Sequence, residues 1–121
     1  MNSLYKTNNF KPGIHTSAVI DKTAIIGSDC YIGPNVYIGE NTVIGNNNHI
    51  LPGSSILGNV RIGNNNTIHP NCVIYENTTL KNNCVINSNT VIGSEGFGFI
   101  PQDGKWVKMP QKGGVKIMSF V

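Results

Sequence analysis

Two groups of residues in this 121-residue chain are of types that can perform chemistry. The first group consists of histidines and cysteines, which bind zinc or, in the case of the thiols, form disulfides: His15, His49, His69, Cys30, Cys72 and Cys84. The second group lies between residues 97 and 116, where aromatic side chains and lysines are mixed. A basic, aromatic segment suits contact with an acidic partner or a phosphate. What each group does depends on the elements that position it.

A six-residue repeat runs through most of the chain. Fourteen successive positions, spaced by six, carry thirteen isoleucines and one leucine: Ile14, Ile20, Ile26, Ile32, Ile38, Ile44, Ile50, Ile56, Ile62, Ile68, Ile74, Leu80, Ile86 and Ile92. A period of six fits neither a helix nor a long strand, but it suits a short strand followed by a tight turn. Three such strands per coil would stack as parallel strands about 4.7–4.9 Å apart. The repeat therefore predicts an all-β fold, a parallel β-helix.

The other columns of the repeat support this architecture. A small or medium-sized residue stands four positions after each aliphatic one, where it leaves room at an inner corner. Asn stands three positions after it in nine repeats and tolerates the left-handed backbone of a tight turn: Asn35, Asn41, Asn47, Asn59, Asn65, Asn71, Asn77, Asn83 and Asn89. Gly follows it directly in six repeats, where backbone conformation or close approach excludes a side chain: Gly27, Gly33, Gly39, Gly45, Gly63 and Gly93.

The repeat argues against metal and disulfide chemistry in the first group. All three cysteines fall in the small inward column, and Cys30 and Cys84 lie three coils, or about 14 Å, apart, which is too far for a disulfide. His15 and His69 are also three coils apart and should point outward, and His49 occupies a different column. We therefore predict reduced core thiols, surface or interface histidines and no metal site.

Composition excludes several classes of protein. Only 12% of the residues are charged, and no apolar run approaches the ~20 residues of a membrane span. Residues 1–97 carry five basic and five acidic groups, so the whole net charge of +3 lies in the C-terminal segment. We expect no transmembrane segment, no secretory signal and no nucleic-acid partner. The outward columns also lack the regular Thr-x-Thr file of an ice-binding surface.

The repeat stops after Ile92 and Gly93, and the segment that follows holds the only tryptophan and four of the nine basic residues. A solenoid that gathers aromatic residues in one excursion places a feature outside its core, and such excursions commonly carry function or oligomer contacts. We select five residues here as candidates for contact with a substrate or partner: Phe97, Phe99, Trp106, Lys105 and Lys108. The alternative is a hairpin that only covers a seam between subunits.

The chain resembles the UDP-3-O-(3-hydroxyacyl)glucosamine N-acyltransferases of lipid A (lipopolysaccharide) biosynthesis in the runs IHPNCVIYENTTL, VIGSEGFGF and GKWVKMPQKGGVKI. The resemblance covers about residues 12–117. It implies a left-handed β-helix and a cytoplasmic homotrimer with active sites between subunits, in a Gram-negative-type bacterium. It also implies transfer of a 3-hydroxyacyl group from acyl carrier protein to the 2-amino group of a UDP-linked acylglucosamine, without a cofactor.

The chain departs from that family at both ends. Some 13 residues precede the first repeat, where the family has a domain that helps hold the uridine, and the chain stops at Val121, before the family's general-base histidine. We therefore assign no catalytic residue and expect a single, incomplete solenoid domain that is inactive alone. Its expected parts are a lead-in (1–13), the β-helix (14–97), a basic, aromatic excursion loop (98–116) and a truncated coil (117–121).

Two alternative functions stay open at this point. One is a different hexapeptide-repeat sugar acetyltransferase that uses coenzyme A, although such an enzyme need not carry the aromatic run. The other is a non-catalytic trimeric β-helix scaffold, which the missing catalytic segment would favour.

Overall fold

The computed structural model describes residues 10–93, 97–102, 105–110 and 116–117. These residues form seventeen strands, of which all but β15 and β16 are two residues long. In chain order they are β1 (Gly13–Ile14), β2 (Val19–Ile20), β3 (Ile25–Ile26), β4 (Tyr31–Ile32), β5 (Tyr37–Ile38), β6 (Val43–Ile44), β7 (His49–Ile50), β8 (Ser55–Ile56), β9 (Arg61–Ile62), β10 (Thr67–Ile68), β11 (Val73–Ile74), β12 (Thr79–Leu80), β13 (Val85–Ile86), β14 (Val91–Ile92), β15 (Phe97–Gln102), β16 (Lys105–Pro110) and β17 (Lys116–Ile117). Within these ranges no helix has the length and apolarity that a membrane span requires.

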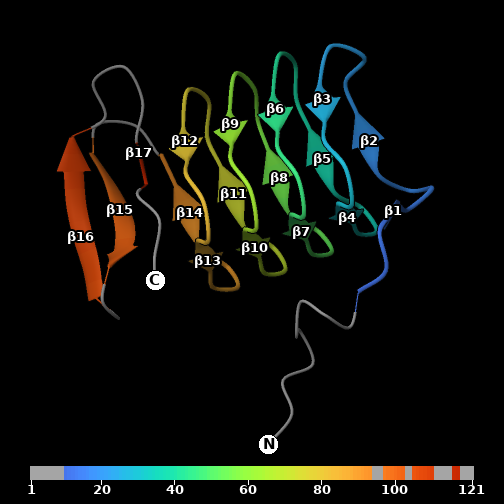
Figure 1. Cartoon of the computed structure of the whole chain (residues 1–121). Coiled ribbons are helices and arrows are strands. Elements are labelled where there is room, and N and C mark those ends of the chain that lie inside the picture. The colour runs from blue at the N-terminus through green and yellow to red at the C-terminus, as the bar shows by residue number, and fades with distance from the viewer. Residues whose placement is uncertain (1–9, 94–96, 103–104, 111–115, 118–121) are drawn as a thin grey trace, which may run out of the picture.

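The short strands form three five-stranded parallel sheets. We name them sheet A (β1-β4-β7-β10-β13), sheet B (β2-β5-β8-β11-β14) and sheet C (β3-β6-β9-β12-β17). Every third strand along the chain is paired, and the register joins residues 18 apart, such as Ile14 with Ile32. Figure 1 shows the resulting stack of coils, with β1–β3 at one end and β15 and β16 at the other. The predicted fold class, an all-β parallel β-helix of hexapeptide repeats, is confirmed.

The aliphatic column fills the interior of the prism. From the second coil onward its members are almost fully inaccessible: Ile32, Ile38, Ile44, Ile50, Ile56, Ile62, Ile68, Ile74, Leu80, Ile86 and Ile92. Cys30, Cys72 and Cys84 belong to the same buried cluster, and none of them is in a disulfide. The prediction that the thiols are small, reduced core residues is therefore confirmed.

The predicted turn residues adopt the predicted conformation. All nine asparagines of the turn column have φ between 52° and 66°, in the left-handed region that Asn tolerates better than most residues. Asp29 fills the same position with φ of 58°, and Gly53 does so with φ of 79°. From Asp29 to Asn89, each corner of the prism is thus made by a single left-handed residue whose type suits the turn, whereas Ser17 and Thr23 hold this position in the first coil without a positive φ.

Glycine recurs in its column for a different reason from asparagine in the turn column. Of its six members only Gly93 has a positive φ, so close approach explains the others. At Gly45 the side-chain oxygen of Asn64, one coil on, occupies the space that a Cβ would need. That oxygen also accepts a hydrogen bond of 2.7 Å from the backbone N–H of Asn46. The same pairing of a glycine with an asparagine recurs at Gly27 with Asn46 and at Gly63 with Asn82.

A hairpin interrupts the coils after β14. Strands β15 and β16 pair as antiparallel partners, from Phe97 opposite Pro110 to Gln102 opposite Lys105. The chain then returns to the solenoid, because β17 pairs with β12 and places Ile117 in register with Leu80. The excursion is therefore a two-stranded ribbon inserted between consecutive positions of the prism.

Candidate functional site

The five candidates selected from the sequence all lie on the hairpin. Its register puts Phe99 opposite Lys108 and Pro101 opposite Trp106. Since residues directly opposite each other share a face and side chains alternate along a strand, positions 97, 99, 106 and 108 belong to one face and position 105 to the other. The side chains lie outside what the structure describes, so the contact role of Phe97, Phe99, Trp106, Lys105 and Lys108 stays a prediction.

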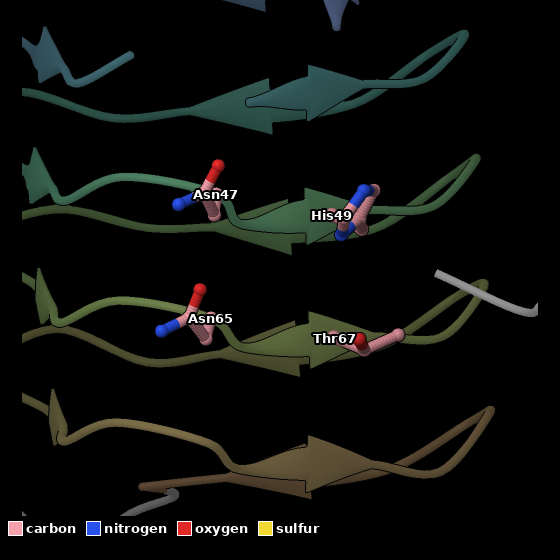
Figure 2. Close-up of a pocket in the computed structure, with 4 residues that line it drawn as sticks. All are labelled: Asn47, His49, Asn65 and Thr67. Atoms are coloured by element: carbon pink, nitrogen blue, oxygen red, sulfur yellow. The ribbon is translucent and has the colours of Figure 1, made fainter. Parts of the chain in front are cut away.

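A small polar pocket, which no local sequence motif indicates, lies on the outer face of sheet A. It has a volume of about 120 Å³ and is lined by Asn47, His49, Asn65 and Thr67. Figure 2 shows the two asparagines side by side from successive coils, with His49 and Thr67 beside them on β7 and β10. The pocket joins residues 18 apart, so the signal for it is the column that runs through one sheet rather than any local motif.

An aromatic cluster borders this pocket. The ring of Phe10 packs on Tyr31, with 4.9 Å between ring centroids, and on His49, with 5.9 Å. Tyr31, His49 and Thr67 occupy the same outward column on three successive coils. The step from two ring side chains to the small Thr67 leaves the space that forms the pocket.

Burial controls the protonation of two histidines. His49 and His69 are each partly buried, and because desolvation penalises the charged imidazolium, the pKa of each lies below its ordinary 6.5. His15 is exposed, and its Nδ1 accepts a hydrogen bond of 3.0 Å from the backbone N–H of Ser17. His49 and His69 therefore share a partly buried setting, whereas His15 is exposed.

We expect the protein to lose stability in mild acid. The unfolded chain binds protons at the ordinary histidine pKa of about 6.5, above the lowered values of His49 and His69, so the free energy of unfolding falls as the pH drops below about 6.5. His49→Gln should reduce this dependence in urea unfolding at about pH 7.5 and pH 5.5. An unchanged slope in His49→Gln would contradict the assignment.

A second pocket lies at the corner that follows sheet B. It has a volume of about 280 Å³ and is lined by Tyr37, Glu40, Leu57, Gly58, Asn59 and Glu76. Glu40 and Glu76 hold equivalent positions two coils apart, and Gly58 between them has no side chain to fill the space. Both carboxylates are exposed, and the part of the chain that the structure describes supplies no ion pair to either of them.

The two pockets differ in the charge of the groups that line them. No group of three or more His, Cys, Asp and Glu side chains among them could hold a metal ion. The sheet A pocket offers neutral amide, imidazole and hydroxyl groups, whereas the corner pocket offers two negative charges. The one strongly basic segment, with four lysines and one aspartate, is the hairpin and its flanks.

Comparison with known proteins finds relatives over the whole chain. The family described as the GMPPB C-terminal domain matches residues 14–96. Three curated relatives from strains of Prochlorococcus marinus are named UDP-3-O-acylglucosamine N-acyltransferase and are 84%, 77% and 88% identical over 121 residues. The match covers 100% of this chain but only 35% of each relative.

Two solved structures are similar in fold. LpxA, a UDP-N-acetylglucosamine acyltransferase from Bacteroides fragilis, is 30% identical with a TM-score of 0.63, covering 88% of this chain and 44% of that chain. The acetyltransferase domain of PglB from Neisseria gonorrhoeae is 21% identical with a TM-score of 0.57, covering 81% and 59%. The second likeness concerns the fold alone.

Proposed function

Because this chain belongs to the UDP-3-O-acylglucosamine N-acyltransferase family, and its repeats to the GMPPB C-terminal domain family, we propose that it forms part of an enzyme of lipid A biosynthesis. The enzyme would transfer a 3-hydroxyacyl group from acyl carrier protein to UDP-3-O-acylglucosamine. The observation that carries the proposal is the identity of 77–88% across both the coils and the inserted hairpin.

The proposed reaction is an acyl transfer to nitrogen. The 2-amino group of the sugar attacks the carbonyl carbon of the thioester, a C–N bond forms, and the C–S bond to acyl carrier protein breaks. The amine loses a proton and the departing thiolate gains one. We assign the general base to none of His15, His49 and His69, because none of them falls in the segment where the family resemblance puts it.

The proposal includes a cytoplasmic homotrimer. Exposed apolar side chains lie on the outer face of sheet B, among them Val19, Tyr37 and Val91, with Ser55 interrupting the column, and exposed apolar surface favours subunit contact. Three buried, reduced thiols fit the reducing conditions of the cytoplasm. Acyl carrier protein and the UDP-linked acylglucosamine are the proposed partners.

Binding of acyl carrier protein tests the proposed function. The hairpin and its flanks hold all of the net positive charge, and the family's acyl carrier protein is acidic, so electrostatic attraction should dominate the encounter. Replacing Lys105, Lys108, Lys112 and Lys116 with Gln should weaken binding at least about tenfold at low salt. Surface plasmon resonance at about 50 and 200 mM NaCl gives both the affinity and its salt dependence.

A matched variant separates local charge from net charge. Lys11→Gln, Lys22→Gln and Lys81→Gln together remove three positive charges from the β-helix body and its lead-in. This triple variant should keep most of the wild-type affinity. Equal binding by the wild-type and quadruple-variant proteins would contradict the proposed recognition.

A further inference from the structure

The sheet A pocket contains a buried hydroxyl group that the fold leaves unused. Thr67 belongs to the outward column of sheet A, between His49 and Val85 on the neighbouring strands, yet it is only 4% exposed. Its backbone N–H donates a hydrogen bond of 2.9 Å to the carbonyl oxygen of Cys84, but its side-chain hydroxyl has no partner within the part of the chain that the structure describes. Buried polar groups are almost always hydrogen-bonded, so an unpaired one that lines a pocket points to a ligand.

The other side chains of the pocket are also available for hydrogen bonds. Burial alone lowers the pKa of His49, with no hydrogen bond to its ring, so at neutral pH the imidazole offers one donor and one acceptor. Asn47 and Asn65 are exposed, and their side-chain amides form no hydrogen bond with the described residues. Figure 2 shows these side chains and Thr67 projecting from the same side of two successive coils. The pocket thus combines donors and acceptors without a formal charge.

An aromatic face adjoins these polar groups. The ring of Phe10 lies against Tyr31 and against His49, which also lines the pocket. No Lys, Arg, Asp or Glu is among the described residues that line the pocket, so none of them neutralises an ionic ligand. A sugar has the matching chemistry, because its hydroxyl groups both donate and accept hydrogen bonds and the C–H groups on its ring faces pack on aromatic side chains.

The volume of the pocket determines how much of such a ligand enters it. About 120 Å³ is room for about four groups the size of a water molecule, which occupies ~30 Å³ in the liquid. A whole sugar ring is larger, so one edge of the ring, with its hydroxyl or acetamido substituents, would enter the pocket. Since Asn47 and Asn65 are exposed, the pocket opens to solvent beside them, and the rest of the ring can stay outside.

We propose that the sheet A pocket binds an uncharged saccharide, whose hydroxyl groups bond to Asn47, Asn65 and Thr67 and whose ring packs on the aromatic side chains of Phe10 and Tyr31. This site goes beyond the proposed function. The acceptor of the proposed acyl transfer carries a charged diphosphate, for which the pocket has no cationic partner among its described residues. The saccharide is therefore a ligand in addition to that acceptor.

Titration of the full chain with N-acetylglucosamine tests the site. Two-dimensional amide NMR should show chemical-shift changes at the side-chain amides of Asn47 and Asn65, with a dissociation constant of roughly 0.1–10 mM for a ligand of this size. An absence of shift changes at up to about 50 mM sugar would overturn the proposal. Glucose 6-phosphate should bind no more tightly than glucose, because the pocket offers no positive charge. Tighter binding of the phosphate would indicate an anion site and would also overturn it.

Two variants remove individual contacts without straining the fold. Thr67→Val replaces the hydroxyl with a methyl group of similar size in a strand, and Asn65→Gly removes the amide at a position whose φ of 61° glycine accepts. Each should weaken sugar binding roughly three- to tenfold. The matched controls, Thr79→Val on sheet C and Asn83→Gly one coil beyond Asn65, remove the same groups outside the pocket and should bind like wild type.

The outcomes separate this site from the proposed function, because binding of the free sugar requires no acyl carrier protein. Circular dichroism of each variant verifies folding. Equal affinities in the two pocket variants and their two controls would overturn the saccharide site and leave the enzyme assignment to the acyl carrier protein experiment. Sugar binding that depends on Thr67 and Asn65 would support the site even if acyl carrier protein did not bind.

Discussion

Replacing Gly39 with alanine is expected to lower the free energy of unfolding by about 3–5 kcal/mol. A methyl group at this position would overlap with the backbone carbonyl oxygen of Leu57 and lie 2.6 Å from its carbonyl carbon. No side-chain rotation relieves such a clash, so two coils must separate. The backbone hydrogen bonds from Gly39 N–H to Ile56 (2.7 Å) and from Asn59 N–H to Glu40 (2.8 Å) would stretch as they do.

Gly58 provides the matched control. Gly58 lies one coil beyond Glu40 and in the same column as Glu40, one position after the column of Gly39. A Cβ at Gly58 would be no closer than 3.5 Å to the nearest contacting atom, the backbone oxygen of Glu40. Its φ is also outside the left-handed region. Gly58→Ala should therefore stay within about 0.5 kcal/mol of wild type, or gain slightly because alanine restricts the unfolded chain. Similar losses in the two variants would show that the cost is not steric.

Thermal unfolding measures the difference directly. For a chain of this size, a loss of about 3–5 kcal/mol should lower the midpoint by roughly 10–25 °C. Gly58→Ala should move the midpoint by only a few degrees. A Gly39→Ala protein that melts like wild type would mean that the coils accommodate the methyl group.

The sequence was sufficient to predict the coils because most columns of the repeat reflect a single physical requirement, such as burial in the core or a left-handed turn. Ile at every sixth position could only be a core column, and the Asn column coincides with the left-handed residues in all nine repeats. The glycine column was ambiguous between backbone conformation and close approach. Only the structure separates Gly93, with a positive φ, from Gly39 and Gly45, which lie against the next coil.

The candidate sites were harder to predict because they depend on contacts between coils. The sheet A pocket exists because Thr67 stands one coil beyond His49, a relation that appears in the sequence only once the 18-residue register is fixed. The corner pocket needs Gly58 between two glutamates in the same way. The composition of the hairpin was visible in the sequence, but the pairing of Phe99 with Lys108 depends on where the ribbon turns.

The second large effect is expected inside the prism, at Asn66. Its side chain is fully buried; Nδ2 donates a hydrogen bond of 2.7 Å to the carbonyl of Lys81, and Oδ1 accepts one of 2.7 Å from the N–H of Cys84. Asn66→Ala leaves both backbone groups without partners in a site that water does not reach. At about 1–3 kcal/mol for each unsatisfied group, the free energy of unfolding should fall by about 3–5 kcal/mol.

Asn64 makes a similar bond in a different environment, which isolates the cause. Its Oδ1 accepts a hydrogen bond of 2.7 Å from the N–H of Asn46, but the site is exposed and water can replace the amide. Asn64→Ala should therefore cost only about 0.5–1.5 kcal/mol in urea unfolding. Equal losses at the two positions would contradict the argument, because Asn66 makes two side-chain hydrogen bonds in a buried site and Asn64 accepts one in an exposed site.

An isosteric variant distinguishes the lost donor from the lost volume. Asn66→Asp keeps the shape and the acceptor for Cys84, but at neutral pH it places a carboxylate against the carbonyl of Lys81, where the amide had donated. Burial of an unpaired charge should make this variant at least as unstable as Asn66→Ala. Protonation of the carboxyl restores a donor, so Asn66→Asp should gain stability relative to Asn64→Asp as the pH falls toward about 4. A pH-independent difference between the two aspartate variants would mean that packing, and not the hydrogen bond to Lys81, determines why asparagine stands inside this prism.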